Sequence, residues 1–201
     1  MWLPKVMALA MSISLSWLTP GNAEEGDRML FEFDKPEAAE AWRNINDNVM
    51  GGVSEGKFRI TDDKTLEFYG NLSLENNGGF ASVRCRSTRL DLSKDEAVKF
   101  KVRGDGRTYY FNINVPSLIP AFSYRAKFET EKDKWQEIQI PLKDFRATSF
   151  GREIPGSLDP AKAEAVGFLL VDKTAGPFKL EVAWIKAVPK NGPRGAEDET
   201  N

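Results

Sequence analysis

The chain has 201 residues and a nearly balanced charge, with 28 Lys and Arg against 30 Asp and Glu. A slightly acidic chain whose basic residues are spread out is not expected to attract nucleic acid or an anionic membrane surface. The chain contains one cysteine and no histidine. An internal disulfide is therefore excluded, as are catalytic triads and metal sites that depend on an imidazole.

Residues 1–23 have the features of a secretory signal peptide. Lys5 precedes an apolar run from Val6 to Leu18, and small residues lead to a cleavage point after Ala23. A transmembrane helix needs about 20 apolar residues, so this run is too short to span a bilayer comfortably. We therefore predict export to the periplasm or the extracellular space, with no membrane-spanning segment after cleavage.

Apolar and polar residues alternate with period two after residue 56, which is typical of half-buried antiparallel strands. Strands are predicted at residues 29–33, 57–61, 66–74, 80–86, 98–103, 109–115, 122–129, 135–140, 166–171 and 178–184. Many short strands joined by Gly, Asn and Asp turns favour an all-β sandwich of two sheets. Residues 24–188 are therefore expected to form one domain. Residues 189–201 are rich in Pro, Gly and charge, and are predicted to be a disordered tail.

Two short helices are expected beside the strands. Asp34 is placed to cap a helix that has Pro36 in its first turn and runs to Trp42. A second helix is predicted to start after Asp159-Pro160 and to run to Ala165. Helices this few do not alternate with the strands as a parallel α/β sheet would require.

Two polar, glycine-rich loops are the best binding candidates, Asn46–Ser54 and Glu75–Phe80. Their side chains could hold sugar hydroxyls, a polypeptide backbone or a calcium ion. The same side chains also stabilise turns by local hydrogen bonds, which leaves a purely structural role open. Met50 is unusual in a polar loop and is expected either to plug the core or to contact a partner. The candidate binding residues are Asp47, Asn48, Met50, Asn76, Asn77 and Arg84 on one rim, together with Asp105 and Arg107.

Two short motifs have simpler explanations than the functions that they suggest. Arg103–Asp105 spells an adhesion tripeptide, but Gly104–Arg107 is a hairpin-turn signature between two alternating runs. Gly52–Gly56 matches the nucleophile elbow of α/β-hydrolases, yet no histidine can serve as its base and a strand follows where a helix is needed. Cys85 alternates with buried positions and is expected to be a small core residue.

No catalytic residue, resident metal or cofactor is predicted. The chain has no Gly-x-Gly-x-x-Gly fingerprint for a dinucleotide. A hydrolase that uses paired carboxylates is the weakest alternative. Its candidate residues are Asp47, Glu55, Glu75, Asp105 and Asp172.

Several motifs occur in a characteristic order along residues 29–188. They are N-D-N-V-M-G-G-V-S at 46–54, L-E-F-Y-G-N-L-S-L-E-N-N-G-G-F-A-S-V-R at 66–84, V-R-G-D-G-R-T-Y at 102–109, Y-R-A-K-F-E-T at 124–130 and W-Q-E-I-Q-I-P at 135–141. Gly167-Phe168, Asp172-Lys173 and Gly176–Phe178 complete the pattern. In this order and density they resemble the complex I intermediate-associated protein 30 family.

The resemblance implies a galactose-binding-domain-like jelly-roll β-sandwich. It also implies a non-catalytic assembly factor or chaperone for respiratory complex I (NADH:ubiquinone oxidoreductase), with protein partners such as subunits of that complex. Mitochondrial members carry a transit peptide, whereas the N-terminal residues here predict export. The alternative is an exported carbohydrate-binding module that takes a saccharide. Such a module would display exposed aromatic residues in a groove, for which Tyr69, Tyr110 and Phe122 are available.

Overall fold

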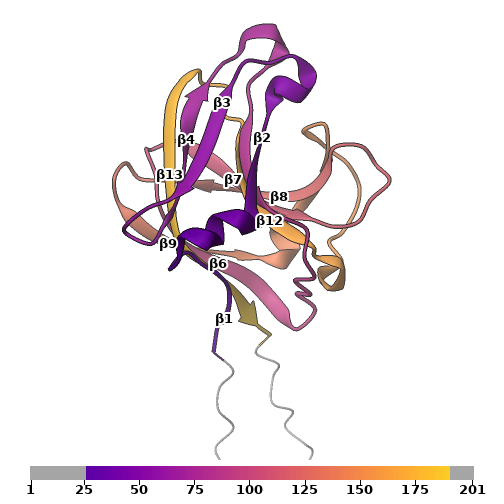
Figure 1. Ribbon diagram of the computed structural model, residues 1–201. Coiled ribbons are helices and arrows are strands. Elements are labelled where there is room, and N and C mark those ends of the chain that lie inside the picture. The colour runs from indigo at the N-terminus through magenta and orange to yellow at the C-terminus, as the bar shows by residue number, and fades with distance from the viewer. Residues whose placement is uncertain (1–25, 191–201) are drawn as a thin grey trace, which may run out of the picture.

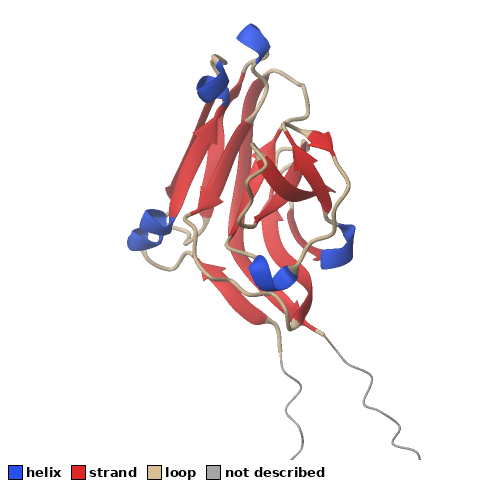
Figure 2. Ribbon diagram, turned by 90° about the vertical axis from the view of Figure 1, so that its right-hand side faces the viewer, coloured by secondary structure: helices blue, strands red, loops and turns tan. Residues whose placement is uncertain are grey.

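Two antiparallel β-sheets pack face to face to form a sandwich (Figure 1). The computed structural model describes residues 26–190, without the side chains of Val49 and Met50, so the predicted signal at 1–23 lies outside the described residues. Strands make up most of the molecule, and its short helices lie in the connections between them (Figure 2). The predicted all-β sandwich is therefore confirmed.

The first sheet has six strands in the order β3-β4-β13-β6-β9, and β1 also pairs with β13. Their bounds are β1 Arg28–Glu32, β3 Glu55–Ile60, β4 Leu66–Leu72, β6 Asp95–Arg103, β9 Trp135–Pro141 and β13 Gly176–Pro189. The second sheet has seven strands in the order β11-β10-β8-β7-β12-β5-β2. Their bounds are β2 Trp42–Asn46, β5 Ala81–Cys85, β7 Thr108–Asn114, β8 Phe122–Glu129, β10 Arg146–Ser149, β11 Arg152–Glu153 and β12 Ala165–Leu170.

The core lies between the sheets and is rich in aromatic side chains. Phe100 on β6 stacks on Phe111 of β7 with ring centroids 4.8 Å apart, and Phe168 of β12 meets both rings edge to face. All three side chains are fully buried. Because successive side chains on a strand point to opposite faces, the period-two pattern gives each sheet one apolar inner face and one polar outer face. Cys85 is buried as predicted, and burial raises the pKa of its thiol.

Both predicted helices are shorter than expected and are of the 3-10 type. The first is η1, Pro36–Ala41; it starts after Lys35 and receives no side-chain cap, so the predicted cap at Asp34 was wrong. The second, η5, is Pro160–Lys162, and here Asp159 does cap by accepting a hydrogen bond from the Ala161 N–H. The remaining helices are η2 Asp47–Met50, η3 Glu75–Asn77 and η4 Leu142–Asp144. No helix among residues 26–190 is long and apolar enough to cross a membrane.

Three strands were not predicted, and one predicted hairpin was wrong. β2, β10 and β11 are short and carry many polar side chains, so they lack the alternation that marks the other strands. Residues 104–107 do not close a hairpin, because β6 and β7 belong to different sheets and this segment crosses between them. Pro189 still pairs with Asp95 at the end of β13, so the sheet extends into the predicted tail. Residues 191–201 lie outside the described residues.

Candidate functional site

The outer face of the six-stranded sheet pairs its arginines with carboxylates. Arg59 on β3 lies 2.5 Å from a carboxylate oxygen of Glu67 on β4. Arg103 on β6 lies 2.6 Å from Glu181 on β13. The two pairs line one hollow of about 400 Å³, so both arginines of this hollow have a counter-charge within the chain.

The outer face of the seven-stranded sheet carries an arginine row without such partners. We use the name arginine row for Arg43, Arg84 and Arg125, which the strand register aligns across the sheet. Arg43 lies opposite Arg84, Arg84 opposite Gly167, Gly167 opposite Asn112, and Asn112 opposite Arg125. Residues directly opposite each other share one face of a sheet. Among residues 26–190, no carboxylate oxygen lies within 4.0 Å of a guanidinium nitrogen of these three arginines.

Several polar atoms on this face are buried without a hydrogen-bond partner in the described part of the chain. They include the Nε atoms of Arg84 and Arg125 and the Oδ1 atoms of Asn112 and Asn114. Burial lowers the pKa of both arginines, and the neighbouring charge of Arg43 lowers the pKa of Arg84 further. Arginine starts from a pKa so far above 7 that both side chains stay charged. Native proteins usually pair such atoms with protein groups or water, so these atoms show that the polar groups of this face are not satisfied by one another.

Gly167, which is itself buried, contributes no side chain to the middle of the row. A Cβ atom at this position would lie 2.3 Å from the carbonyl oxygen of Val83 on β5, so the close strand approach admits only glycine. No side chain therefore stands between Arg84 and Asn112. With strands about 4.8 Å apart, the backbones of Arg84 and Arg125 are separated by about 14 Å.

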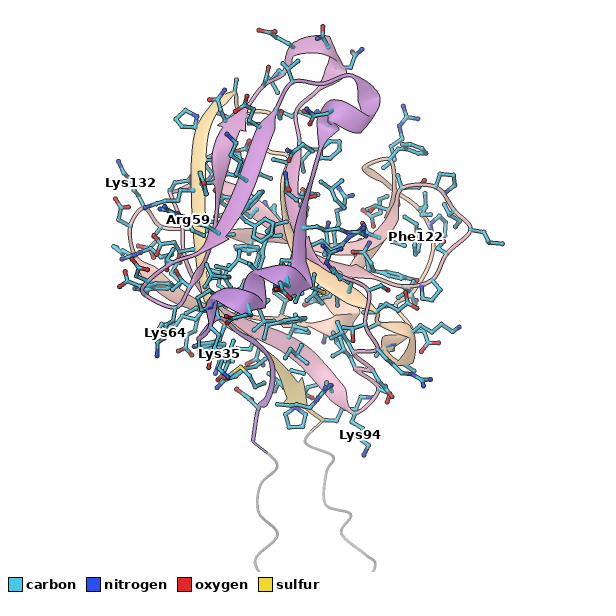
Figure 3. The ribbon with its side chains drawn as sticks, viewed as in Figure 1. Lys35, Arg59, Lys64, Lys94, Phe122 and Lys132 are labelled. Atoms are coloured by element: carbon cyan, nitrogen blue, oxygen red, sulfur yellow. The ribbon has the colours of Figure 1, made fainter. Side chains whose placement is uncertain are left out.

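A hollow of about 220 Å³ adjoins one end of the arginine row. Arg43, Arg84, Asn114, Phe122 and Glu164 contribute to its lining. The carboxylate of Glu164 accepts a hydrogen bond of 2.9 Å from the Ser87 hydroxyl instead of pairing with an arginine. Figure 3 places Phe122 and Arg59 on opposite sides of the molecule, in keeping with their positions on different sheets.

An apolar tip stands beside this face, and we define it by Leu118, Ile119 and Phe150. Leu118 is 103% exposed, Phe150 62% and Ile119 47%. A hydrogen bond of 2.9 Å from the Ser149 hydroxyl to the Pro120 carbonyl joins the two loops that carry these residues. Large apolar side chains gathered at an exposed position are typical of interaction sites.

The predicted rim residue Asp47 lies inside the molecule, where it joins the two polar loops. Its carboxylate accepts hydrogen bonds from the Ser54 N–H at 2.9 Å, the Ser54 hydroxyl at 2.5 Å, the Gly79 N–H at 2.7 Å and the Phe80 N–H at 3.3 Å. Asp47 is fully buried. The two loops lie side by side at the top of Figure 1, as these bonds require.

Both Gly-Gly pairs are explained by the close approach of backbone to this carboxylate. A Cβ at Gly52 would lie 2.4 Å from Asp47 Cγ, and one at Gly78 would lie 2.7 Å from Asp47 Oδ2. Gly51 and Gly79 have φ of 90° and 119°, which only glycine adopts without strain. The serine of the false nucleophile elbow, Ser54, is equally buried.

The other candidate residues lie either on the two polar loops or at the crossing between the sheets. Asn48, Asn76 and Asn77 are exposed on the loops, with Asn76 and Asn77 at φ of 54° and 60° as tight turns require. The side chain of Met50 lies outside the described part. Asp105 and Arg107 lie elsewhere, at the crossing between the sheets, where Arg107 pairs with Asp172 at 2.7 Å and Asp105 accepts a hydrogen bond from the Lys179 N–H at 2.9 Å. Of the predicted set, only Arg84 belongs to the arginine row.

Apart from Arg84, the residues of the arginine row could not be predicted from the sequence. Arg43, Asn112, Asn114 and Arg125 occupy outward strand positions, where polar residues are ordinary. What distinguishes the arginines is that no carboxylate lies opposite them across the sheet. This depends on the strand register, which the sequence does not reveal. Glycine at position 167 within an otherwise apolar strand is the one local signal of a close backbone approach.

Replacing Arg84 by methionine should raise the free energy of unfolding, by up to about 1 kcal/mol, because it removes an unpaired, partly buried charge that faces Arg43. Methionine keeps most of the apolar side-chain stem. Urea unfolding of wild type and Arg84→Met measures the change. The matched control is Arg59→Met, which breaks the pair with Glu67 and should lower stability. A loss of stability in Arg84→Met as large as that in the control would contradict an unpaired Arg84.

Comparisons with known proteins give the family and the fold. Residues 31–182 match the family model described as Complex I intermediate-associated protein 30 (CIA30). The mouse protein named Complex I intermediate-associated protein 30, mitochondrial, is 29% identical over 184 residues, which cover 80% of this chain and 56% of the mouse protein. The protein of that name from Drosophila melanogaster is 23% identical, covering 83% of this chain and 63% of its own length. The chain thus spans somewhat more than half the length of these relatives.

Solved structures of carbohydrate-binding modules share the fold. The family 11 module of the cellulosomal cellulase Lic26A-Cel5E from Clostridium thermocellum has a TM-score of 0.62 and 18% identity, covering 82% of this chain and 95% of the module. A family 30 module of that organism has a TM-score of 0.55 and 15% identity, covering 83% of this chain and 99% of the module. Identities this low show the fold alone. The family model matches residues 31–182, which are most of this chain. The chain therefore belongs to the complex I intermediate-associated protein 30 family.

Proposed function

We propose that this protein is a non-catalytic assembly factor that binds a protein partner on the outer face of its seven-stranded sheet. The observation that carries the proposal is the arginine row, whose buried polar atoms have no partner in the described chain. The apolar tip next to this face adds the exposed hydrophobic surface that protein partners commonly bury. Relatives named as complex I intermediate-associated proteins support subunits of respiratory complex I as the partner class.

A binding role also agrees with the chemistry of the buried groups. Ser54, the residue that a hydrolase elbow would use, hydrogen-bonds to Asp47 and to the Ser73 carbonyl in the interior. The chain offers no histidine to activate it. Three of the five carboxylates proposed for a hydrolase are likewise engaged, since Asp47 accepts from the loops, Asp172 pairs with Arg107 and Asp105 accepts from a backbone N–H.

A second candidate function is saccharide binding on the same face. Two of the three aromatic residues expected for it lie there, with Tyr110 beneath the Arg125 guanidinium at 5.8 Å and Phe122 in the lining of the hollow. Tyr69 lies on the other sheet, near Arg59. The family 11 module has also been solved with a β-1,3-1,4-mixed-linked tetrasaccharide. A saccharide that raises the melting temperature of the purified protein would support this candidate.

Site-specific photocrosslinking in the native host tests the proposed function. A photoreactive amino acid at Leu118 in the apolar tip should crosslink to a subunit of respiratory complex I, identified by mass spectrometry. The same group at exposed Lys57, on the other sheet, is the matched control and should give no such product. A third position, Asn48, tests whether the polar loops also contact the partner. Crosslinking of the same subunit from Lys57 as strongly as from Leu118, or no complex I subunit from Leu118, would contradict the proposal.

A further inference from the structure

The two outer faces of this sandwich differ in whether their arginines lie beside carboxylates. On the six-stranded sheet, Arg59 and Arg103 each have a glutamate within 2.6 Å. On the seven-stranded sheet, Arg84 and Arg125 have none in the described chain, although burial lowers the pKa of both. A buried charge left without a counter-charge destabilises a protein. On this face Arg146, opposite Arg125, lies 3.8 Å from a carboxylate oxygen of Glu153, but Arg84 and Arg125 themselves have no such counter-charge in the described chain. Their guanidinium groups are therefore available for an external anion.

We propose that the arginine row binds the carboxylates of an acidic, extended segment of the partner protein. This inference rests on the proposed function and names the chemistry of the partner at that site. A guanidinium offers its Nε–H and a terminal N–H side by side, which matches the two oxygens of a carboxylate. The Nε atoms of Arg84 and Arg125 are buried, so the donors open to a carboxylate are the two terminal nitrogens of each guanidinium, which also lie side by side and donate to no acceptor in the described chain.

Asn112 lies in the middle of the row, on the same face as Arg84 and Arg125. Its Oδ1 atom is buried, so the part of its amide that can reach a peptide is the NH2 group, which can donate to a backbone carbonyl. Side chains two positions apart on an extended strand are separated by about 7 Å and lie on the same side. Two acidic residues four positions apart are therefore separated by about 14 Å, which matches the distance between the backbones of Arg84 and Arg125.

The charges around the row define where the carboxylates bind. Glu164 lies beside Arg43 and Arg84 in the adjoining hollow and would repel an anion there. Lys127, on β8 opposite Tyr110, adds a positive charge near Arg125, although a carboxylate of Glu129 lies 3.6 Å away. The favourable position for an acidic segment is thus over Gly167, between Arg84 and Arg125. A neutral saccharide would satisfy the hydrogen bonds of this position but would leave its positive charge uncompensated.

The test uses a fluorescein-labelled octapeptide that alternates Glu with Thr, and a control octapeptide in which Gln replaces Glu. Fluorescence anisotropy with the mature protein at low ionic strength should show binding of the Glu peptide at least about tenfold tighter than the Gln peptide, and added salt should weaken it. Arg84→Gln and Arg125→Gln should each weaken binding by at least about tenfold. Arg84→Lys, which keeps the charge but loses the fork, should also bind more weakly than wild type.

Arg59→Gln is the matched control, because it removes one positive charge from the other sheet and should leave binding unchanged. Circular dichroism confirms that each variant is folded. Equal binding of the two peptides, or equal weakening by Arg59→Gln, would overturn the inference. Arginine-dependent binding of an oligogalacturonate without binding of the Glu peptide would also overturn it, in favour of an acidic saccharide. If the peptide fails while the crosslink from Leu118 to a complex I subunit persists, the inference falls and the proposed function stands.

Discussion

Replacing Asp47 by alanine should lower the free energy of unfolding by about 3–5 kcal/mol, because three backbone N–H groups and a hydroxyl lose a buried acceptor at once. The donors belong to Ser54, Gly79 and Phe80. Urea denaturation followed by tryptophan fluorescence measures the effect. Asn48→Ala, which changes the exposed neighbour, is the control and should shift stability by less than about 0.5 kcal/mol. An Asp47→Ala midpoint equal to that of the control would show that the carboxylate does not hold the loops together.

The same carboxylate should make stability depend on acidity. Burial alone would raise the pKa of Asp47 and is the largest single effect, but the hydrogen bonds from Ser54, Gly79 and Phe80 together outweigh it and hold the pKa below its ordinary value. A carboxylate with a lowered pKa in the folded state stabilises fully above its unfolded pKa of about 4, and this contribution is lost as the pH falls through the folded value. Stability measured from pH 7 downward should therefore fall less in Asp47→Asn than in wild type below about pH 4.

Replacing Arg107 by alanine should lower the free energy of unfolding by about 3 kcal/mol, because it leaves Asp172 as an uncompensated, largely buried charge. Arg107 donates to both oxygens of Asp172, at 2.9 Å and 2.7 Å, and also to the carbonyl oxygens of Thr174 and Pro177. Only 12% of the Arg107 side chain and 14% of the Asp172 side chain are exposed. The pair therefore fixes the crossing between the sheets to the β12–β13 connection.

A double-mutant cycle separates the ion pair from the other contacts of Arg107. In the Arg107→Ala variant, burial still raises the pKa of Asp172, but the arginine that lowers this pKa is absent. The double variant Arg107→Ala/Asp172→Asn should be less destabilised than the sum of the single variants, by about 1 kcal/mol or more. The exposed pair of Lys57 and Glu55 provides the control, since Lys57→Ala should change stability by less than about 1 kcal/mol. Strictly additive effects of Arg107→Ala and Asp172→Asn would show that the two charges act independently.

The long strands of this fold could be predicted because their inner faces alternate cleanly, as in β7, where Tyr109, Phe111 and Ile113 are all fully buried. β2 could not, since only Trp42 among its residues is buried and the rest of the strand is polar or half-exposed. The crossing at residues 104–107 has the composition of a hairpin turn. Which sheet each flanking strand joins is decided by long-range pairing, which local turn chemistry does not encode.

The candidate site, like the fold, could be predicted from the sequence only in part. The importance of Asp47 could be predicted from its loop, but its position could not, because its partner loop lies more than thirty residues further along the chain. The arginine row requires four strand pairings to bring Arg43, Arg84 and Arg125 into line. Each arginine alone resembles a solvated surface residue, and only the assembled register shows that no acid stands opposite.

The hydrogen bonds of Asp47 also bear on how one end of the sandwich becomes ordered. Asp47 follows β2 of the seven-stranded sheet, Ser54 precedes β3 of the six-stranded sheet, and Gly79 precedes β5. One carboxylate therefore needs strands of both sheets in place before its donors can reach it. Contacts of this kind form only after non-local chain closure, whose entropy must be lost first. The two loops are thus a single cooperative unit, and neither can adopt its native conformation while the other is unfolded.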